Sequence, residues 1–227
     1  ASVDYSTSNG SATAGGDYTA IATGTVNFAI GETSKTISVD ISNDSVFEGS
    51  ETFNVNLTNA TGATISDNQG VGTIKDDGTG TGGTDNDTPT LSISSPTVTE
   101  GSAAVFTVSL SNASNTPVSF TPTLSSGTAT LGTDTAAANT LEVSTDGGST
   151  WSTVSGAVTI AAGQTSVQLR LASTDHSLAE SAEDFTLVTG AITGTVTNAS
   201  GVTGTATITD NDIAPTLSIN DITVNEA

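Results

Sequence analysis

Short runs in which apolar and polar residues alternate recur along the chain. The clearest span residues 37–41, 53–57, 106–110, 167–171 and 206–208. Alternation with a period of two places every second side chain on one face of a β-strand. Gly, Asn and Asp interrupt the runs and predict turns, whereas helical periodicity is almost absent. The pattern predicts an all-β chain of tandem immunoglobulin-like antiparallel β-sandwiches with cores poor in aromatic residues.

Internal repeats divide this pattern into units. Three matches align parts of the chain: 10–17 with 127–134, 31–53 with 163–185, and 89–100 with 215–226. We therefore predict four segments. They are residues 1–77, a repeat that lacks its opening strands; 78–87, a flexible Gly/Thr/Asp-rich linker; 88–212, a complete repeat; and 213–227, the first strand of a further repeat. We expect the chain to be part of a longer array.

The net charge of the chain limits the classes of partner that it can bind. The chain carries 24 acidic and 3 basic residues, a formal net charge of -21. Nucleic-acid binding depends on Lys and Arg, so we expect no nucleic-acid partner. No apolar run approaches the length of a membrane helix, and we expect no membrane insertion. Without cysteine the chain can form no disulfide. The abundance of small polar residues favours an extracellular or cell-surface location.

The carboxylates lie at the ends of the predicted strands, at matching places in the two repeats. Alternate turns of antiparallel strands share one end of a sandwich, so these loops can converge. Converging carboxylates repel one another unless a cation neutralises them. An all-oxygen ligand set suits Ca²⁺, whereas Zn²⁺ would prefer Cys or His, and His176 is the only histidine. A single Asp in a turn is explained equally well by its own hydrogen bonds to the backbone.

Taken in order, these motifs resemble the Calx-β repeat family. The resemblance rests on Gly-x-Ala-x-x-Gly-x-Asp at 10–17 and again at 127–134, the acidic stretches 44–53 and 175–185, and the strand ends 72–77 and 206–212. It implies Calx-β-type sandwiches that bind Ca²⁺. The implied ligands are Asp17, Asp44, Glu48, Glu51, Asp76 and Asp77 in the first repeat, and Glu100, Asp134, Asp175, Glu180, Glu183, Asp210 and Asp212 in the second. The paired aspartate of the family is replaced by Asn43-Asp44 and by Asp175-His176, so weaker binding is expected.

Two other signals carry less functional weight. Residues 144–151 match an Asp-box, Ser-x-Asp-x-Gly-x-Thr-Trp, which predicts a structural hairpin closed by Asp146 and covered by Trp151. His176 lacks a nucleophile motif nearby, and we predict that it is a bystander in a calcium turn and that the chain is not an enzyme.

The function predicted is that of a calcium-binding structural or adhesive repeat in a large secreted or cell-surface protein. Its partners would be calcium ions, neighbouring repeats of the chain and, by strand exchange, a second copy whose segment 216–226 covers the open edge of the first repeat. A calcium-sensing regulatory module and a calcium-independent glycan- or ligand-binding module remain alternatives.

Overall fold

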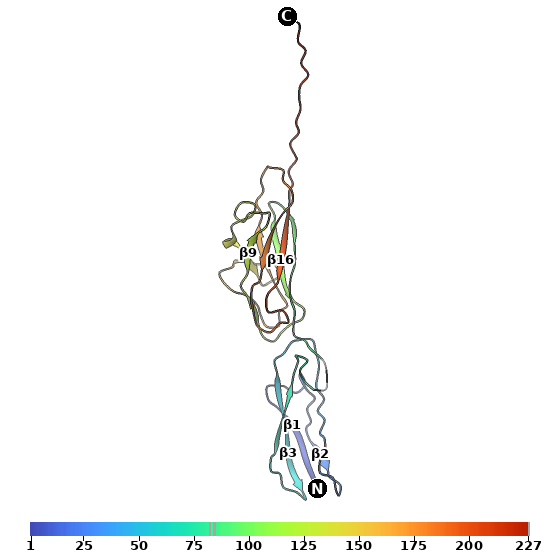
Figure 1. Cartoon of the computed structure of the whole chain (residues 1–227). Helices are drawn as coiled ribbons and strands as arrows, with labels where there is room; N and C mark the ends of the chain where they lie inside the picture. The colour runs from blue at the N-terminus through green and yellow to red at the C-terminus, as the bar shows by residue number, and fades with distance from the viewer. Residues whose placement is uncertain (82, 84, 227) are drawn as a thin grey trace.

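The structure is a computed structural model that describes residues 1–81, 83 and 85–226. The predictions for linker residues 82 and 84 and for residue 227 lie outside this range. Two β-rich units are joined end to end, and the N-terminus and C-terminus lie at opposite ends of the elongated molecule (Figure 1). No helix among the described residues is long and apolar enough to cross a membrane.

The first unit contains one four-stranded antiparallel sheet. Its strands are β1 (Ser2–Asn9), β2 (Gly24–Asn27), β3 (Glu51–Thr61) and β4 (Gln69–Ile74). The order across the sheet is β2-β1-β3-β4, so β2 and β4 are its edges.

The second unit contains three sheets that enclose one core. Their orders are β11-β10-β13-β7-β5, β12-β8-β15 and β6-β16-β14-β9, and only the β6–β16 pair is parallel among the described strands. The elements are β5 (Leu91–Ile93), β6 (Thr97–Thr99), β7 (Ala103–Leu110), β8 (Val118–Phe120), β9 (Thr123–Ser126), the 3-10 helix η1 (Ala138–Thr140), β10 (Glu142–Ser144), β11 (Ser152–Thr153), β12 (Val158–Ile160), β13 (Ser166–Ala172), β14 (Glu183–Val188), β15 (Ile192–Thr193) and β16 (Thr203–Thr209).

Alternation along the strands builds the core of the second unit. β7 follows a strict pattern in which every second residue is buried, and so do its neighbour β13 and β16 of another sheet. Phe106 of β7 meets Phe185 of β14 edge-to-face, with ring centroids 5.8 Å apart. The predicted strands at 106–110, 167–171 and 206–208 are therefore confirmed, and the aliphatic side chains around this pair bury the apolar face of each sheet.

The Asp-box hairpin is also confirmed as a structural element. The Asp146 carboxylate accepts hydrogen bonds from the backbone N–H and the hydroxyl of Thr150 and from the hydroxyl of Ser144. These bonds hold the pKa of Asp146 down, at about 2. Trp151 donates from Nε1 to the carbonyl of Gly148, and the Arg170 guanidinium lies 4.2 Å from the centroid of its ring. The hairpin joins β10 to β11 at the edge of the sandwich.

The first unit has a much smaller core. Its buried cluster consists of Ala12, Tyr18 and Phe53, with the rings of Tyr18 and Phe53 stacked 4.8 Å apart. The strand predicted at 37–41 is wrong: this segment is not a strand in the structure. The internal repeat aligns residues 37–41 with β13, which pairs with β7 and β10. The described part of the first unit contains no strand that corresponds to β7 or to β10. Around the segment only one isolated bridge forms, between Tyr18 and Ile41, and a single bridge does not make a ladder.

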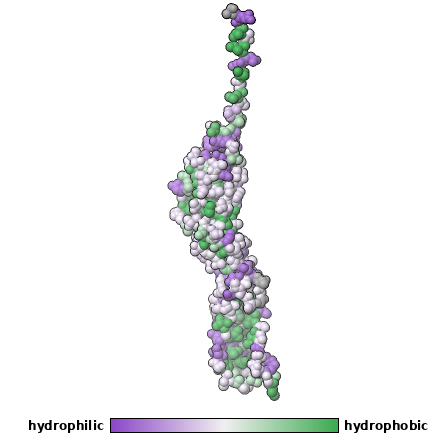
Figure 2. Space-filling view, viewed as in Figure 1, coloured by the Kyte–Doolittle hydropathy of each residue, from purple (hydrophilic) through white to green (hydrophobic). Residues whose placement is uncertain are grey.

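Residues 213–226 leave the second unit as an extended tail without strand assignment (Figure 1). Its apolar side chains are exposed, including Leu217 and Val224 at 101% and 76% of full exposure. Figure 2 shows these hydrophobic residues alternating with polar ones along the tail, and further hydrophobic side chains on the visible face of the first unit.

Candidate metal centre

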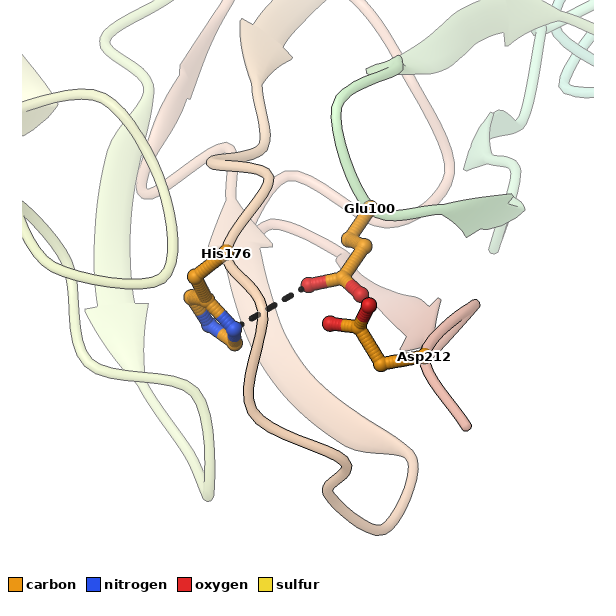
Figure 3. Close-up of side chains that lie close together, drawn as sticks. All are labelled: Glu100, His176 and Asp212. Atoms are coloured by element: carbon orange, nitrogen blue, oxygen red, sulfur yellow. Dashed lines mark ion pairs between the residues drawn. The ribbon is translucent and has the colours of Figure 1, made fainter. Parts of the chain in front are cut away.

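Acidic loops of the second unit converge at the end from which the tail leaves. Glu100 follows β6, His176 lies in the loop after β13, and Asp212 follows β16. One ligand atom of each lies within 4.8 Å of the others, and Figure 3 shows the three side chains pointing toward one another. Strands that are far apart in sequence thus bring their carboxylates to one point, as the turn positions predicted.

His176, which we predicted to be a bystander in the calcium turn, lies among the carboxylates of this cluster. Its Nδ1 lies 3.3 Å from Oε2 of Glu100, and its Nε2 lies 3.3 Å from Oε2 of Glu180 and 4.0 Å from Oδ1 of Asp134. The contact between Nδ1 of His176 and Glu100 is not a hydrogen bond. Nδ1 of His176 and Oδ2 of Asp212 are both buried, and neither has a hydrogen-bond partner among the described residues. Both atoms are free to bind a further group.

Backbone hydrogen bonds hold the surrounding carboxylates in place. Asp134 accepts from the N–H of Thr130 at 2.6 Å, and Asp210 accepts from the N–H groups of Glu180 and Asp212 at 2.9 and 3.1 Å. Asp134 therefore has one oxygen fixed by its own loop, whereas both oxygens of Asp210 accept hydrogen bonds, one of them from the loop of Glu180. Because both lone pairs of a carboxylate oxygen can act, an ion can still be bound by the same groups.

The first unit repeats this framework. Asp17 accepts from the N–H of Thr13 at 2.6 Å, and Asp76 accepts from the N–H of Glu48 at 2.7 Å, in the positions of Asp134 and Asp210. Asp17, Glu48 and Glu51 bring ligand atoms within 4.8 Å of one another. The two units thus present equivalent acidic clusters built by equivalent local bonds.

A third cluster, Asp76 with Asp85 and Asp87, was not predicted. Asp85 and Asp87 belong to the linker, which turns back so that the N–H of Asp87 donates to the carbonyl of Asp76. The Asp85-Asn86-Asp87 sequence directly after the Gly/Thr run was the available signal. This arrangement places the linker beside the acidic loops of the first unit.

Seven predicted ligands lie outside these groups of three: Asp44, Asp77, Asp134, Asp175, Glu180, Glu183 and Asp210. Asp77 accepts from the N–H and hydroxyl of Thr79, and Asp44 accepts from the N–H of Val46. Asp175 accepts from the side-chain amide of Asn211 at 3.3 Å. Glu183 lines the same pocket as Glu100, Asp134, His176, Glu180 and Asp210.

The electrostatics of both clusters favour a bound cation. Burial, followed by repulsion from Asp134 and Glu180, raises the pKa of Glu183. Burial, followed by repulsion from Asp17, likewise raises the pKa values of Glu48 and Glu51. Among the described residues no Lys or Arg forms an ion pair with either cluster. An ion in their midst would remove this repulsion.

Comparison with known protein families identifies the family of the chain. The family model described as Calx-beta domain matches residues 1–78 and 135–213. The chain belongs to the Calx-beta domain family. A solved structure to which the chain is similar, the calcium binding domain CBD12 of CALX1.1, matches at 18% identity and a TM-score of 0.33, covering 84% of this chain and 67% of that one. No curated protein sequence matches the chain.

Among solved structures, the chain is similar to the apo-form Calx CBD1 domain, at 16% identity and a TM-score of 0.39, covering 55% of this chain and 99% of that one. It is also similar to CBD12 from CALX1.2, at 16% identity and a TM-score of 0.40, covering 91% of this chain and 86% of that one.

The residues of both Calx-beta units fit a calcium ion. Their donors are almost entirely carboxylate oxygens from several loops, which is the ligand type that Ca²⁺ prefers. The unpartnered Oδ2 of Asp212 and the raised pKa of Glu183 mark the second cluster as a set of donors whose charge is not compensated within the chain. A zinc site would require more nitrogen or sulfur donors than His176 provides.

Proposed function

We propose that the chain is a calcium-binding structural repeat of a large secreted or cell-surface protein, in which calcium stabilises and stiffens the tandem Calx-beta units. The observation that carries the proposal is that carboxylates from corresponding loops line one pocket in each unit, and that no Lys or Arg among the described residues forms an ion pair with them. Glu100, Asp134, Glu180, Glu183, Asp210 and Asp212 would hold the ion in the second unit, and Asp17, Glu48, Glu51 and Asp76 in the first. We propose no catalytic activity.

Stabilisation follows from linkage between binding and folding. The ligands come from loops that are distant in sequence, so they converge only in the folded unit. An ion that binds only this state adds about 1.4 to 2.7 kcal/mol to the free energy of unfolding when its concentration is ten to a hundred times Kd. Extracellular calcium modules commonly have Kd values of about 0.1 to 1 mM, so such sites would fill outside the cell.

Stiffening follows from the position of the third cluster. Asp85 and Asp87 of the linker lie beside Asp76, and Phe47 of the first unit exchanges backbone hydrogen bonds with Ala113 and Asn115 of the second. A cation held by the linker and the first unit together would restrain the joint between the units. Such restraint suits a spacer or adhesive stalk. Strand exchange with a second copy is part of the proposal.

Hydrogen exchange with and without calcium tests the proposal. In millimolar calcium, the amides of loops 43–51, 76–87 and 174–183 should exchange more slowly than in EDTA, while those of β7 should change little. The Asp85→Asn/Asp87→Asn variant should lose protection in the linker but keep it in the second unit. Equal exchange in calcium and EDTA throughout these loops would contradict the proposal. A Kd in the micromolar range would favour a sensor over a stalk.

A further inference from the structure

Two buried polar atoms of the second unit lie unpaired in the same cluster. Nδ1 of His176 and Oδ2 of Asp212 are the only buried side-chain nitrogen or oxygen atoms without a hydrogen-bond partner among the described residues. Buried polar atoms are normally hydrogen-bonded, because an unpaired one has lost its bonds to water and gained none in return. Two such atoms in one place indicate that a further group binds between them.

Glu100 completes a group of three ligands with these two residues. The side chain of Glu100 is 3% exposed, and its Oε2 lies 3.3 Å from Nδ1 of His176. One ligand atom of each residue lies within 4.8 Å of the others, and Figure 3 shows the imidazole and the two carboxylates turned toward one another. Ligands lie about 2.0 to 2.6 Å from a divalent ion, so ligands on opposite sides of it are about 4 to 5 Å apart. The spacing of the three side chains therefore suits a single cation.

Carboxylates on the opposite side of the imidazole determine where its proton lies. Nε2 of His176 lies 3.3 Å from Oε2 of Glu180 and 4.0 Å from Oδ1 of Asp134. Carboxylates beside one ring nitrogen favour the tautomer that carries its proton there, and they make the other nitrogen a better metal ligand. The lone pair then belongs to Nδ1, the nitrogen beside Glu100. His176 is thus placed to act as a nitrogen ligand.

The corresponding position of the first unit carries an oxygen donor. The internal repeat aligns Asp44 with His176, which is the only histidine of the chain. Ca²⁺ prefers oxygen ligands, whereas first-row transition metals also gain from an imidazole nitrogen. Among these metals Mn²⁺ accepts carboxylates as Ca²⁺ does, whereas Zn²⁺ prefers four-coordinate sites with more nitrogen or sulfur. The two units therefore differ in the ion that they favour.

We propose that Nδ1 of His176, together with Glu100 and Asp212, binds a first-row transition-metal dication of the Mn²⁺ type in preference to Ca²⁺. This preference rests on the proposed function, since both place a cation among the converging loops of the second unit. Glu100 and Asp212 can serve either ion, so the two ions compete. The first unit, which has no histidine, keeps the preference for Ca²⁺. One chain then carries cation sites of two different classes.

Titration of the chelated full chain with Mn²⁺ tests the preference. The electron paramagnetic resonance signal of free Mn²⁺ measures how much remains unbound, and Ca²⁺ is then added as the competitor. Displacing the Mn²⁺ that wild type holds most tightly should take at least about ten times more Ca²⁺ than Mn²⁺. His176→Asn should weaken Mn²⁺ binding about tenfold or more, since residues that merely orient a metal ligand already change affinity about 10- to 100-fold. Equal Mn²⁺ affinity of wild type and His176→Asn would overturn the proposal.

A pair of aspartate variants tests the carboxylate part of the site. Asp212→Asn removes the charge of the carboxylate whose Oδ2 is unpartnered, and it should weaken Mn²⁺ binding several-fold or more. Asp221→Asn makes the same change in the exposed tail and should bind Mn²⁺ as wild type does. Equal weakening in both variants would show that net charge alone attracts the ion, and the assigned site would then be wrong.

Pulsed electron paramagnetic resonance of the bound Mn²⁺ tests the nitrogen ligand itself. A directly bound imidazole nitrogen modulates the spin echo, and isotope-labelled histidine changes that modulation. Because His176 is the only histidine, the signal has a single source. Wild type should show the modulation and His176→Asn should lack it. Bound Mn²⁺ without nitrogen modulation in wild type would overturn the ligation.

Calcium titration of the same proteins separates this site from the proposed function. His176→Asn keeps every carboxylate, so a saturable calcium heat should remain, and it also shows that the variant is folded. If Ca²⁺ binds but Mn²⁺ binds equally to wild type and His176→Asn, the nitrogen ligand is wrong and the calcium function stands. If Mn²⁺ binds with nitrogen modulation but no saturable calcium heat appears, the calcium function fails and the Mn²⁺ site stands. If neither ion binds, both are wrong.

Discussion

Replacement of His176 by aspartate should increase the calcium dependence of the second unit's stability. The imidazole is the only nitrogen donor among the described side chains of this cluster, and it contacts the carboxylates of Glu100 and Glu180 at 3.3 Å each. In His176→Asp these contacts are lost and one more carboxylate joins the cluster. The apo unit therefore gains repulsion, and the calcium-bound unit gains a ligand.

The geometry sets the size of both effects. Loss of the imidazole contacts and addition of a like charge should cost the chelated unit about 2 kcal/mol. For a unit of this size, that corresponds to a fall in melting temperature of roughly 6 to 10 °C. In calcium, an added charged ligand should contribute about 1.5 to 3 kcal/mol, or a roughly ten- to hundredfold lower Kd.

Thermal unfolding in EDTA and calorimetric calcium titration measure the two effects separately. His176→Asn is the matched control, because it removes the imidazole without adding a charge. It should destabilise the chelated unit less than His176→Asp and should not tighten calcium binding. The reasoning is refuted if His176→Asp binds calcium no more tightly than His176→Asn.

Three further predictions follow from the two cores and their charges. Burial raises the pKa values of Glu183 and Glu48 above the unfolded values, so folding takes up protons. As the pH falls from 7 to about 5, the chelated protein should become more stable, and the rise in melting temperature that calcium causes should become smaller. A rise in melting temperature that does not change with pH would contradict this. Asp146→Ala should lower the melting temperature of the second unit with unchanged calcium Kd, since its bonds serve the hairpin alone; a changed Kd would argue otherwise. Phe185→Ala should lower the free energy of unfolding of the second unit by about 3 to 5 kcal/mol, and Phe53→Ala should unfold only the first unit. Calorimetry of the wild-type chain should resolve two unfolding transitions. One transition that shifts equally in both variants would be inconsistent with separate cores.

Local sequence patterns were sufficient to predict much of the second unit. The alternation at 106–110 and 167–171 corresponds to buried positions of β7 and β13, because each strand has a partner on both sides and one face on the core. The Asp-box also folds as predicted, since Asp146 bonds only to residues within four positions. Features fixed by short-range contacts can be read from a single sequence.

Features that depend on distant partners were predicted less well. Residues 37–41 have the pattern of a strand, but among the described residues they pair with no strand and form only the isolated bridge of Ile41 with Tyr18. His176 follows Asp175 in an ordinary turn, and only the approach of the loops that carry Glu100 and Glu180 reveals its central position. Asp85 and Asp87 become part of a cluster because the linker folds back onto Asp76. In each case tertiary contact decided the outcome.

Calorimetric titration of the chelated full chain with calcium tests the central claim most directly. Wild type should release or absorb heat that saturates, and Glu183→Gln should lose the part that belongs to the second unit. Asp221→Asn, in the exposed tail, changes the charge equally and should bind as wild type does. A saturable heat that is reduced by Glu183→Gln and kept in Asp221→Asn is the predicted result; no saturable heat, or equal loss in both variants, would contradict calcium binding at the converging loops.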